Sequence, residues 1–215
     1  MLKLKRTLFM LSTILILSAC STAYYSAMEK VGIHKRDIMV DRVVDAKESQ
    51  QEAQKQFKSA LEEMTVLINF DGGDLEAQYN EIQEQYEDSK EAAALVSLRI
   101  DKIEDVADAL FDEWQDEIEQ ISSANLRRQS STKLKETQRR YRSLIKSMRK
   151  AESKMAPVLS ALKDNSLFLK HNLNAKAVGA LQGEMVSIKK DVSALIKDMN
   201  TAIEQSQKFI DMLEK

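Results

Sequence analysis

Residues of the types that perform catalysis or bind metals are scarce in this chain. Its 215 residues include two histidines and one cysteine. His34 and His171 stand far apart, without the close spacing of paired metal ligands. The sequence also lacks a glycine-rich phosphate loop and a nucleophile elbow. We therefore predict that the protein is not an enzyme and that it holds no metal ion and no cofactor.

The one cysteine, Cys20, stands where covalent modification is expected. A positively charged start precedes an apolar stretch at residues 8–17, which is too short to span a bilayer core of roughly 30 Å. The stretch ends at Leu17-Ser18-Ala19-Cys20, which resembles the bacterial lipobox, where a leucine and two small residues precede the lipidated cysteine. We interpret residues 1–19 as a lipoprotein signal peptide. The alternative, a membrane-anchor helix with an incidental cysteine, would need apolar residues where Ser21-Thr22-Ala23 stand.

The lipobox resemblance implies where the chain is held. Cys20 becomes the new N-terminus and carries acyl chains such as palmitate, and two or three such chains anchor a protein stably. Ser21, in place of aspartate, implies the outer membrane, with the protein anchored on the periplasmic side. Residues 20–33 then form the lipidated N-terminus and a short tether. Because lipidation consumes the only thiol, the mature chain cannot form a disulfide.

Regularly spaced apolar residues predict that the rest of the chain is built from long helices. One proline and five glycines leave too few turn formers for a sandwich, a barrel or a doubly wound sheet. Apolar residues recur instead at steps of three and four, as in coiled coils. One such seam, with Ser89 and Glu117 as exceptions, is Leu75, Tyr79, Ile82, Tyr86, Ser89, Ala93, Val96, Ile100, Ile103, Ala107, Leu110, Trp114, Glu117 and Ile121. Another, with Ser206 as its exception, is Val178, Leu181, Met185, Ile188, Val192, Leu195, Met199, Ala202, Ser206, Phe209 and Leu213. A third seam at residues 141–169 is preceded by Leu126 and Leu134.

Short breaks divide the chain into four predicted helices, at about 34–70, 74–121, 126–170 and 175–214. Asp74, which follows two glycines, is a candidate helix cap. Short connections force consecutive helices to run antiparallel. We therefore predict an all-α protein in which residues 34–215 form a single domain, an elongated antiparallel four-helix bundle. We interpret Pro157 as a kink near the middle of the third helix; a break that starts a fifth helix there is the alternative.

Opposite charges distinguish the second and third predicted helices. Residues 74–121 carry 16 acidic and 3 basic side chains, whereas residues 126–170 carry 13 basic and 3 acidic ones. This difference favours pairing of the two helices within one hairpin. The alternative is that the basic helix contacts an external polyanion, although nucleic acid is not expected as a partner in the periplasm. The candidate contacts are Arg127, Arg128, Arg139, Arg140, Arg142 and Arg149.

Two tyrosines, Tyr24 and Tyr25, closely follow the predicted anchor. Tyrosine favours the membrane–water interface, and packing against the end of the bundle is the alternative. The segment from Tyr24 to Ile38, together with the lipobox and the acid-then-basic helices, resembles an uncharacterised family of proteobacterial all-helical lipoproteins, a domain of unknown function. The resemblance covers most of the mature chain. Because the family has no assigned activity, it implies only that Cys20 is lipidated.

These observations favour a structural or protein-interaction role in the cell envelope. The expected partners are the membrane, through the lipid anchor, and either an unidentified envelope protein or further copies of this chain. A carrier of lipids or small molecules, with a cavity inside the bundle, is the alternative. The interior distinguishes the two hypotheses, because narrow seams rich in alanine fill a bundle, whereas a carrier needs a wide apolar lining.

Overall fold

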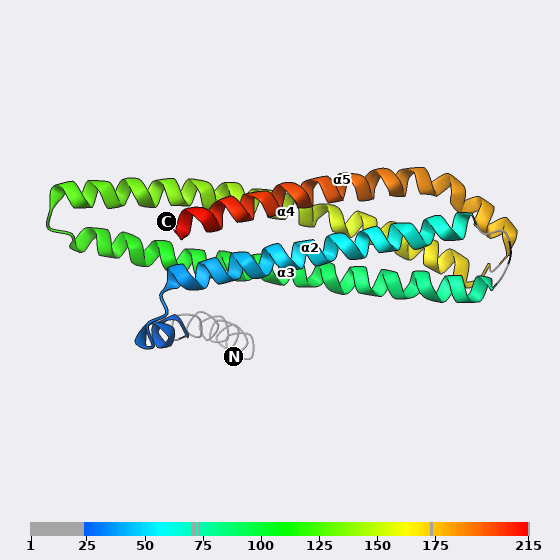
Figure 1. The fold of residues 1–215 in the computed structure, drawn as a ribbon, viewed down its shortest axis with the longest axis horizontal. Coiled ribbons are helices and arrows are strands. Elements are labelled where there is room, and N and C mark those ends of the chain that lie inside the picture. Colours follow the sequence, from blue (N-terminus) through cyan, green and yellow to red (C-terminus); the bar gives the residue numbers. More distant parts are fainter. Residues whose placement is uncertain (1–23, 70–71, 73, 173, 215) are drawn as a thin grey trace, which may run out of the picture. The chain divides into compact units, whose positions relative to one another are not determined.

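The structure, a computed structural model, describes residues 24–69, 72, 74–172 and 174–214 (Figure 1). Its long helices are α2 (Lys35–Ile68), α3 (Leu75–Gln120), α4 (Ala124–Lys170) and α5 (Ala175–Leu213). Residues 24–30 form a further helical segment, and no strand occurs in these described ranges. The all-α prediction is therefore confirmed, and each long helix ends within a few residues of its predicted bounds. The predicted signal peptide (1–19) and Cys20 lie outside the described residues.

Polar side chains fix the starts of α3 and α4. The first backbone N–H groups of a helix have no partner within the helix, so a side-chain oxygen just before it stabilises the start. Asp74 Oδ1 accepts hydrogen bonds from the N–H groups of Glu76 and Ala77, both at 3.0 Å. Ser123 Oγ accepts one from the N–H group of Leu126 at 3.4 Å. The predicted cap at Asp74 is confirmed.

Helix α4 runs without interruption through Pro157, which is exposed. A proline inside a helix removes one backbone hydrogen bond. The neighbouring residues Met155 and Val158 are each only 2% exposed, so apolar packing continues on both sides of the proline. The alternative in which a fifth helix starts at Pro157 is therefore wrong.

The chain divides into two compact units. Unit 1 comprises the residues up to Arg42 together with Lys102–Gln138, and unit 2 comprises Val43–Asp101 and Arg139–Lys215. Helices α2, α3 and α4 contribute to both units, whereas α5 belongs to unit 2 alone.

Side-chain contacts show that neighbouring helices in unit 2 run antiparallel. For each pair of helices, two bonds are compared. As the residue number rises along one helix, the number of its bonded partner falls along the other. These bonds are Lys47–Gln207 and Gln54–Asn200 between α2 and α5, Asp101–Arg149 and Gln83–Ser166 between α3 and α4, and Lys150–Asp198 and Lys154–Ala194 between α4 and α5. Unit 2 is thus a helical bundle with the predicted antiparallel order.

Narrow seams fill the interior of unit 2. All the residues of the seam predicted in α5 are buried, including Ser206, whose hydroxyl donates a 2.8 Å hydrogen bond to the carbonyl oxygen of Ala202. In the middle of α2, Ala46 and Ala53 are at most 1% exposed, which allows neighbouring helices to approach closely. Gln50 lies between them and is fully buried as well. The predicted seams therefore describe the packed core.

Two residues of the predicted seams are exposed rather than buried or half-buried. Glu117 is exposed, and the next residue, Ile118, is buried in its place. A straight helix has about 3.6 residues per turn, so a strict step of 3.5 drifts out of register over several turns. Leu126 is 56% exposed, whereas Leu134 is buried as predicted. The assignments of Glu117 and Leu126 to seams were wrong, while Ser89, the other polar exception in α3, is buried.

In unit 1, the segment just before α2 is part of the folded structure. Tyr25 is only 6% exposed, and burial, together with the nearby Asp105 carboxylate, raises the pKa of its hydroxyl. Lys35, at the start of α2, pairs with Glu29 and with Glu113 of α3. Of the two alternatives for the tyrosines, packing is therefore the one found for Tyr25.

The connection between α3 and α4 has little apolar packing. No residue in the range 119–133, all of which is described, is buried. The two helices are instead joined there by polar contacts, including a 2.9 Å hydrogen bond from Trp114 Nε1 to Ser130 Oγ. Unit 1 therefore contains a helical hairpin whose end is held mainly by hydrogen bonds.

Candidate functional site

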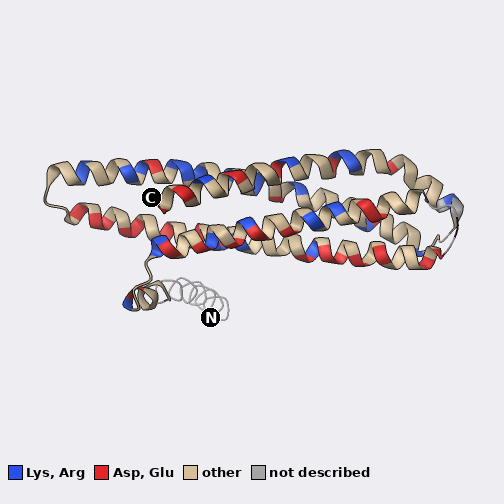
Figure 2. Cartoon of the chain, viewed as in Figure 1, with Lys and Arg blue, Asp and Glu red and all other residues tan. Residues whose placement is uncertain are grey.

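The six arginines that were candidates for polyanion contacts do not gather at one place. Arg127 and Arg128 belong to unit 1, and the other four belong to unit 2. The Arg127 guanidinium donates two hydrogen bonds, at 2.9 and 2.6 Å, to the carbonyl oxygen of Ile121 at the end of α3. Arg149 pairs with Asp101 at 2.5 Å, as the opposite charges of α3 and α4 predict (Figure 2).

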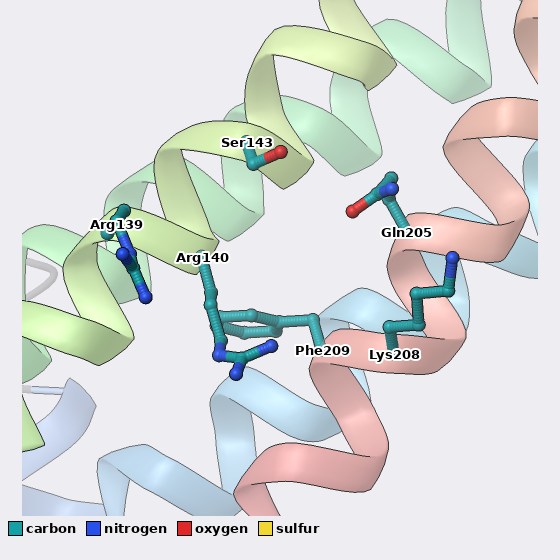
Figure 3. Close-up of a pocket in the computed structure, with 6 residues that line it drawn as sticks. All are labelled: Arg139, Arg140, Ser143, Gln205, Lys208 and Phe209. Carbon is teal, nitrogen blue, oxygen red and sulfur yellow. The ribbon is translucent and has the colours of Figure 1, made fainter.

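Arg139 and Arg140 line a pocket between α4 and α5 of unit 2 (Figure 3). The pocket has a volume of about 350 Å³ and is open to solvent. A third cationic residue of the lining, Lys208, belongs to α5. Figure 3 shows the Arg140 side chain extending from α4 toward Phe209 of α5, which is only 2% exposed. The described residues that line it are Arg139, Arg140, Ser143, Gln205, Lys208 and Phe209.

The antiparallel register of α4 and α5 places these residues opposite one another. Lys150 of α4 faces Asp198 of α5. Ten residues before Lys150 stands Arg140, and ten residues after Asp198 stands Lys208. Because both helices rise by about 1.5 Å per residue, the two cationic side chains come to the same level of the bundle. Phe209 is a seam residue, so its neighbour Lys208 lies at the edge of the interface.

The charge of this pocket differs from that of two other surface depressions in unit 2. One of these combines Asp45, Glu48 and Glu52 with Lys55 and Arg99. The other includes three acidic residues, Asp164, Glu184 and Asp191. The pocket between α4 and α5 has three cationic residues in its lining and no acidic one. Among these three depressions it is therefore the one suited to an anion.

Elsewhere between α4 and α5, two lysines are paired with a carboxylate, in contrast to the cationic residues of the pocket. Asp198, whose side chain is 9% exposed, forms ion pairs with Lys150 at 2.8 Å and with Lys154 at 2.6 Å. These ion pairs, that with Lys150 first, hold the pKa of the Asp198 carboxyl below its usual value. Neither Arg139 nor Lys208 has such a carboxylate partner among the described residues. The interface thus pairs Lys150 and Lys154 with Asp198 at one level, whereas Arg139 and Lys208 line the pocket at another.

Sequence reasoning found Arg139 and Arg140 but missed the residues that complete the pocket. Lys208, Gln205 and Phe209 lie in α5, whose nearly balanced charge gave no signal. Only the register between α4 and α5 brings them beside the two arginines. The other candidate in this part of α4, Arg142, is exposed and is not part of the lining.

Other candidate residues have structural positions. His34 directly precedes α2, and its backbone N–H donates a 3.3 Å hydrogen bond to the Asp37 carboxylate. His171 is exposed just after α4. Across the described residues, no group of three or more histidine, cysteine or acidic side chains is arranged to hold a metal ion. Nor does any helix in this part of the chain combine the length and apolar character needed to cross a membrane.

Comparison with known proteins gives one match. No curated protein and no solved structure matches the chain. A family model described as "Protein of unknown function (DUF2959)" matches residues 24–213, which include both units described above. Since the match covers nearly the entire chain, this protein belongs to the DUF2959 family.

Proposed function

We propose that this protein is a lipoprotein of the bacterial cell envelope, and that its helices act as a structural or protein-interaction module. The lipobox at residues 17–20 supports attachment through Cys20 to the outer membrane on its periplasmic side. The proposed partners are an envelope protein or further copies of this chain, and the proposal includes no catalytic activity.

The filled interior of unit 2 is the observation that carries the interaction role. The α5 seam is buried along its whole length, and small alanines line the facing middle of α2. A carrier needs an apolar chamber, typically of about 300–1,000 Å³, that encloses its ligand. The three depressions described above open to solvent instead. Binding at exposed surfaces therefore fits the geometry better than transport of an enclosed ligand.

The proposed architecture is an elongated antiparallel four-helix bundle formed by residues 34–215. Antiparallel contacts within unit 2 and continuous helices of 34–47 residues support it. Small-angle scattering of the full-length protein in solution tests this directly. An elongated pair-distance distribution is expected, and a spherical one would overturn the architecture.

Metabolic labelling tests the anchor. Cells that express the wild-type chain with radioactive palmitate should yield a labelled, membrane-bound protein. A Cys20→Ala variant should lose the label, whereas a Ser18→Ala variant, which keeps a small residue at that position, should retain it. Equal labelling of Cys20→Ala and wild type would refute lipidation at Cys20.

Photo-cross-linking in intact cells tests the interaction role. A photoreactive amino acid replaces Leu126 of unit 1 or Val186 of unit 2, which are 56% and 75% exposed. A matched control replaces Leu195, which is fully buried. We expect a discrete cross-linked partner from at least one exposed position and none from the control. No cross-linked product from either exposed position would contradict the proposal.

A further inference from the structure

We propose that the pocket between α4 and α5 binds a phosphate group, either as a soluble phosphate or as part of a lipid headgroup. Arg139, Arg140 and Lys208 all line one depression of about 350 Å³. Guanidinium groups present N–H donors in a planar fork that matches phosphate oxygens, and an ammonium group adds a compact positive charge. The residues around the opening therefore provide the donor chemistry that phosphate recognition needs.

Two neutral side chains complete the set of donors. The Ser143 hydroxyl and the Gln205 amide line the same pocket, and both can donate hydrogen bonds to a phosphate oxygen. None of the described residues that line the pocket is acidic, which favours the approach of an anion.

The placement of the other arginines argues against a nucleic acid polymer. Polymers are held by a track of cationic groups along the backbone and by exposed aromatic rings on which bases stack. Arg127 instead caps α3, Arg149 pairs with Asp101, and Phe209 is buried. A single localised group fits the pocket better than a charged chain.

Titration of the full-length protein, held in neutral detergent, tests the site with soluble probes. Isothermal titration calorimetry would use inorganic phosphate, glycerophosphoglycerol as the headgroup of an anionic phospholipid, and zwitterionic glycerophosphocholine as the control ligand. We expect at least one of the first two probes to bind more tightly than glycerophosphocholine. Stronger binding of glycerophosphoglycerol indicates a lipid headgroup, and stronger binding of inorganic phosphate indicates a soluble phosphate. Only the lipid source rests on the proposed membrane attachment, which palmitate labelling tests separately.

Charge substitutions locate the binding. The double substitution Arg139→Glu with Lys208→Glu should weaken binding about tenfold or more, because each lost hydrogen bond to a charged group removes substantial binding energy. The matched control is Lys189→Glu with Lys190→Glu, which makes the same change in net charge on exposed lysines of α5, about 27 Å along the helix from Lys208. This control should change the affinity less than twofold.

Circular dichroism checks that each variant is folded, and Arg139→Gln with Lys208→Gln replaces the reversed pair if that pair unfolds. The proposal is overturned if neither anionic probe binds more tightly than glycerophosphocholine. It is also overturned if the pocket and control variants weaken binding equally.

Discussion

The interior of unit 2 and the end of the α3–α4 hairpin in unit 1 are stabilised by different means. Unit 2 has four helical segments with buried seams, and the α5 seam is apolar along nearly its whole length. In unit 1, the end of the α3–α4 hairpin has no buried residue between 119 and 133 and is held by hydrogen bonds such as that from Trp114 to Ser130. Burial of a large apolar side chain contributes more to the free energy of unfolding than a hydrogen bond does, because the hydrogen bond only replaces one made to water in the unfolded chain. Substitutions of the same type should therefore change the free energy of unfolding by unequal amounts in the interior of unit 2 and at the end of this hairpin.

Truncation of a core leucine should give the largest effect. Leu195 of unit 2 is fully buried, so Leu195→Ala removes apolar contacts and leaves a cavity, and we expect it to lower the free energy of unfolding by about 2–5 kcal/mol. The matched substitution Leu126→Ala in unit 1 should change it by less than about 0.5 kcal/mol. Chemical denaturation followed by far-ultraviolet circular dichroism measures both. Equal effects would remove the proposed difference between the units.

A polar residue inside unit 2 should lower its stability. Gln50 is fully buried, and neither atom of its side-chain amide has a hydrogen-bond partner among the described residues. Because Met has a similar shape and no amide to desolvate, Gln50→Met should raise the free energy of unfolding by about 1–3 kcal/mol. Gln51, the exposed neighbour, provides the control, since Gln51→Met should have almost no effect. A loss of stability in Gln50→Met, measured by the same denaturation, would show that the amide is needed.

The ion pairs of Asp198 should make unit 2 sensitive to acid. Asp198→Asn should lower the free energy of unfolding by about 1–3 kcal/mol at pH 7, because Lys150 and Lys154 lose a charged acceptor. The pKa of Asp198 is lowered in the folded protein, so the carboxylate stabilises the fold fully above the unfolded-state pKa of about 3.9, and this stabilisation is lost as the pH falls through the lower folded value.

Denaturation at pH 7 and at a series of pH values below 4 measures this difference. The gap between wild type and Asp198→Asn should shrink toward low pH. Asp191→Asn, an exposed change on the same helix, should show little difference at any pH. A gap for Asp198→Asn that is independent of pH would contradict the assigned cause.

The smallest effect is expected in the hairpin of unit 1. Ser130→Ala removes the acceptor of the Trp114 indole N–H, and since the indole is only partly buried, we expect a loss of about 0.5–1.5 kcal/mol. Trp114 is the single tryptophan of the chain, so its fluorescence follows unfolding of unit 1. Ser131→Ala is the neighbouring control. Identical fluorescence transitions for the two variants would mean that the hydrogen bond contributes nothing measurable.

The helices and their buried faces could be predicted because the information is local. Burial along one helix repeats with the helical period, so the α5 seam followed from the spacing of residues such as Leu181, Leu195 and Phe209. The cap at Asp74 followed from the residue types beside it. The burial of Ile118 in place of Glu117 could not be predicted, because a fixed step of 3.5 residues ignores the drift that accumulates along a long helix.

Only part of the candidate site could be predicted from the sequence. Arg139 and Arg140 stand out in a basic helix. Lys208 becomes a candidate only because it lies opposite Arg140 and lines the same pocket. That position depends on the register between two helices, which is set by pairs such as Lys150 with Asp198. Contacts between helices distant in sequence leave no periodic signal within either helix. Lipid attachment, in contrast, was inferred from residues 1–23, which lie outside the described structure.

The buried position of Tyr25 limits the length of the linker between a lipid on Cys20 and the folded protein. Tyr25 follows Cys20 by five residues, and a fully extended chain spans at most about 3.6 Å per residue. If Cys20 is acylated, the first packed ring of unit 1 is held within about 18 Å of the modified residue. A binding partner would then have to meet this part of the protein at the bilayer surface, and an inserted spacer before Tyr24 would be the direct means of moving that meeting point outward.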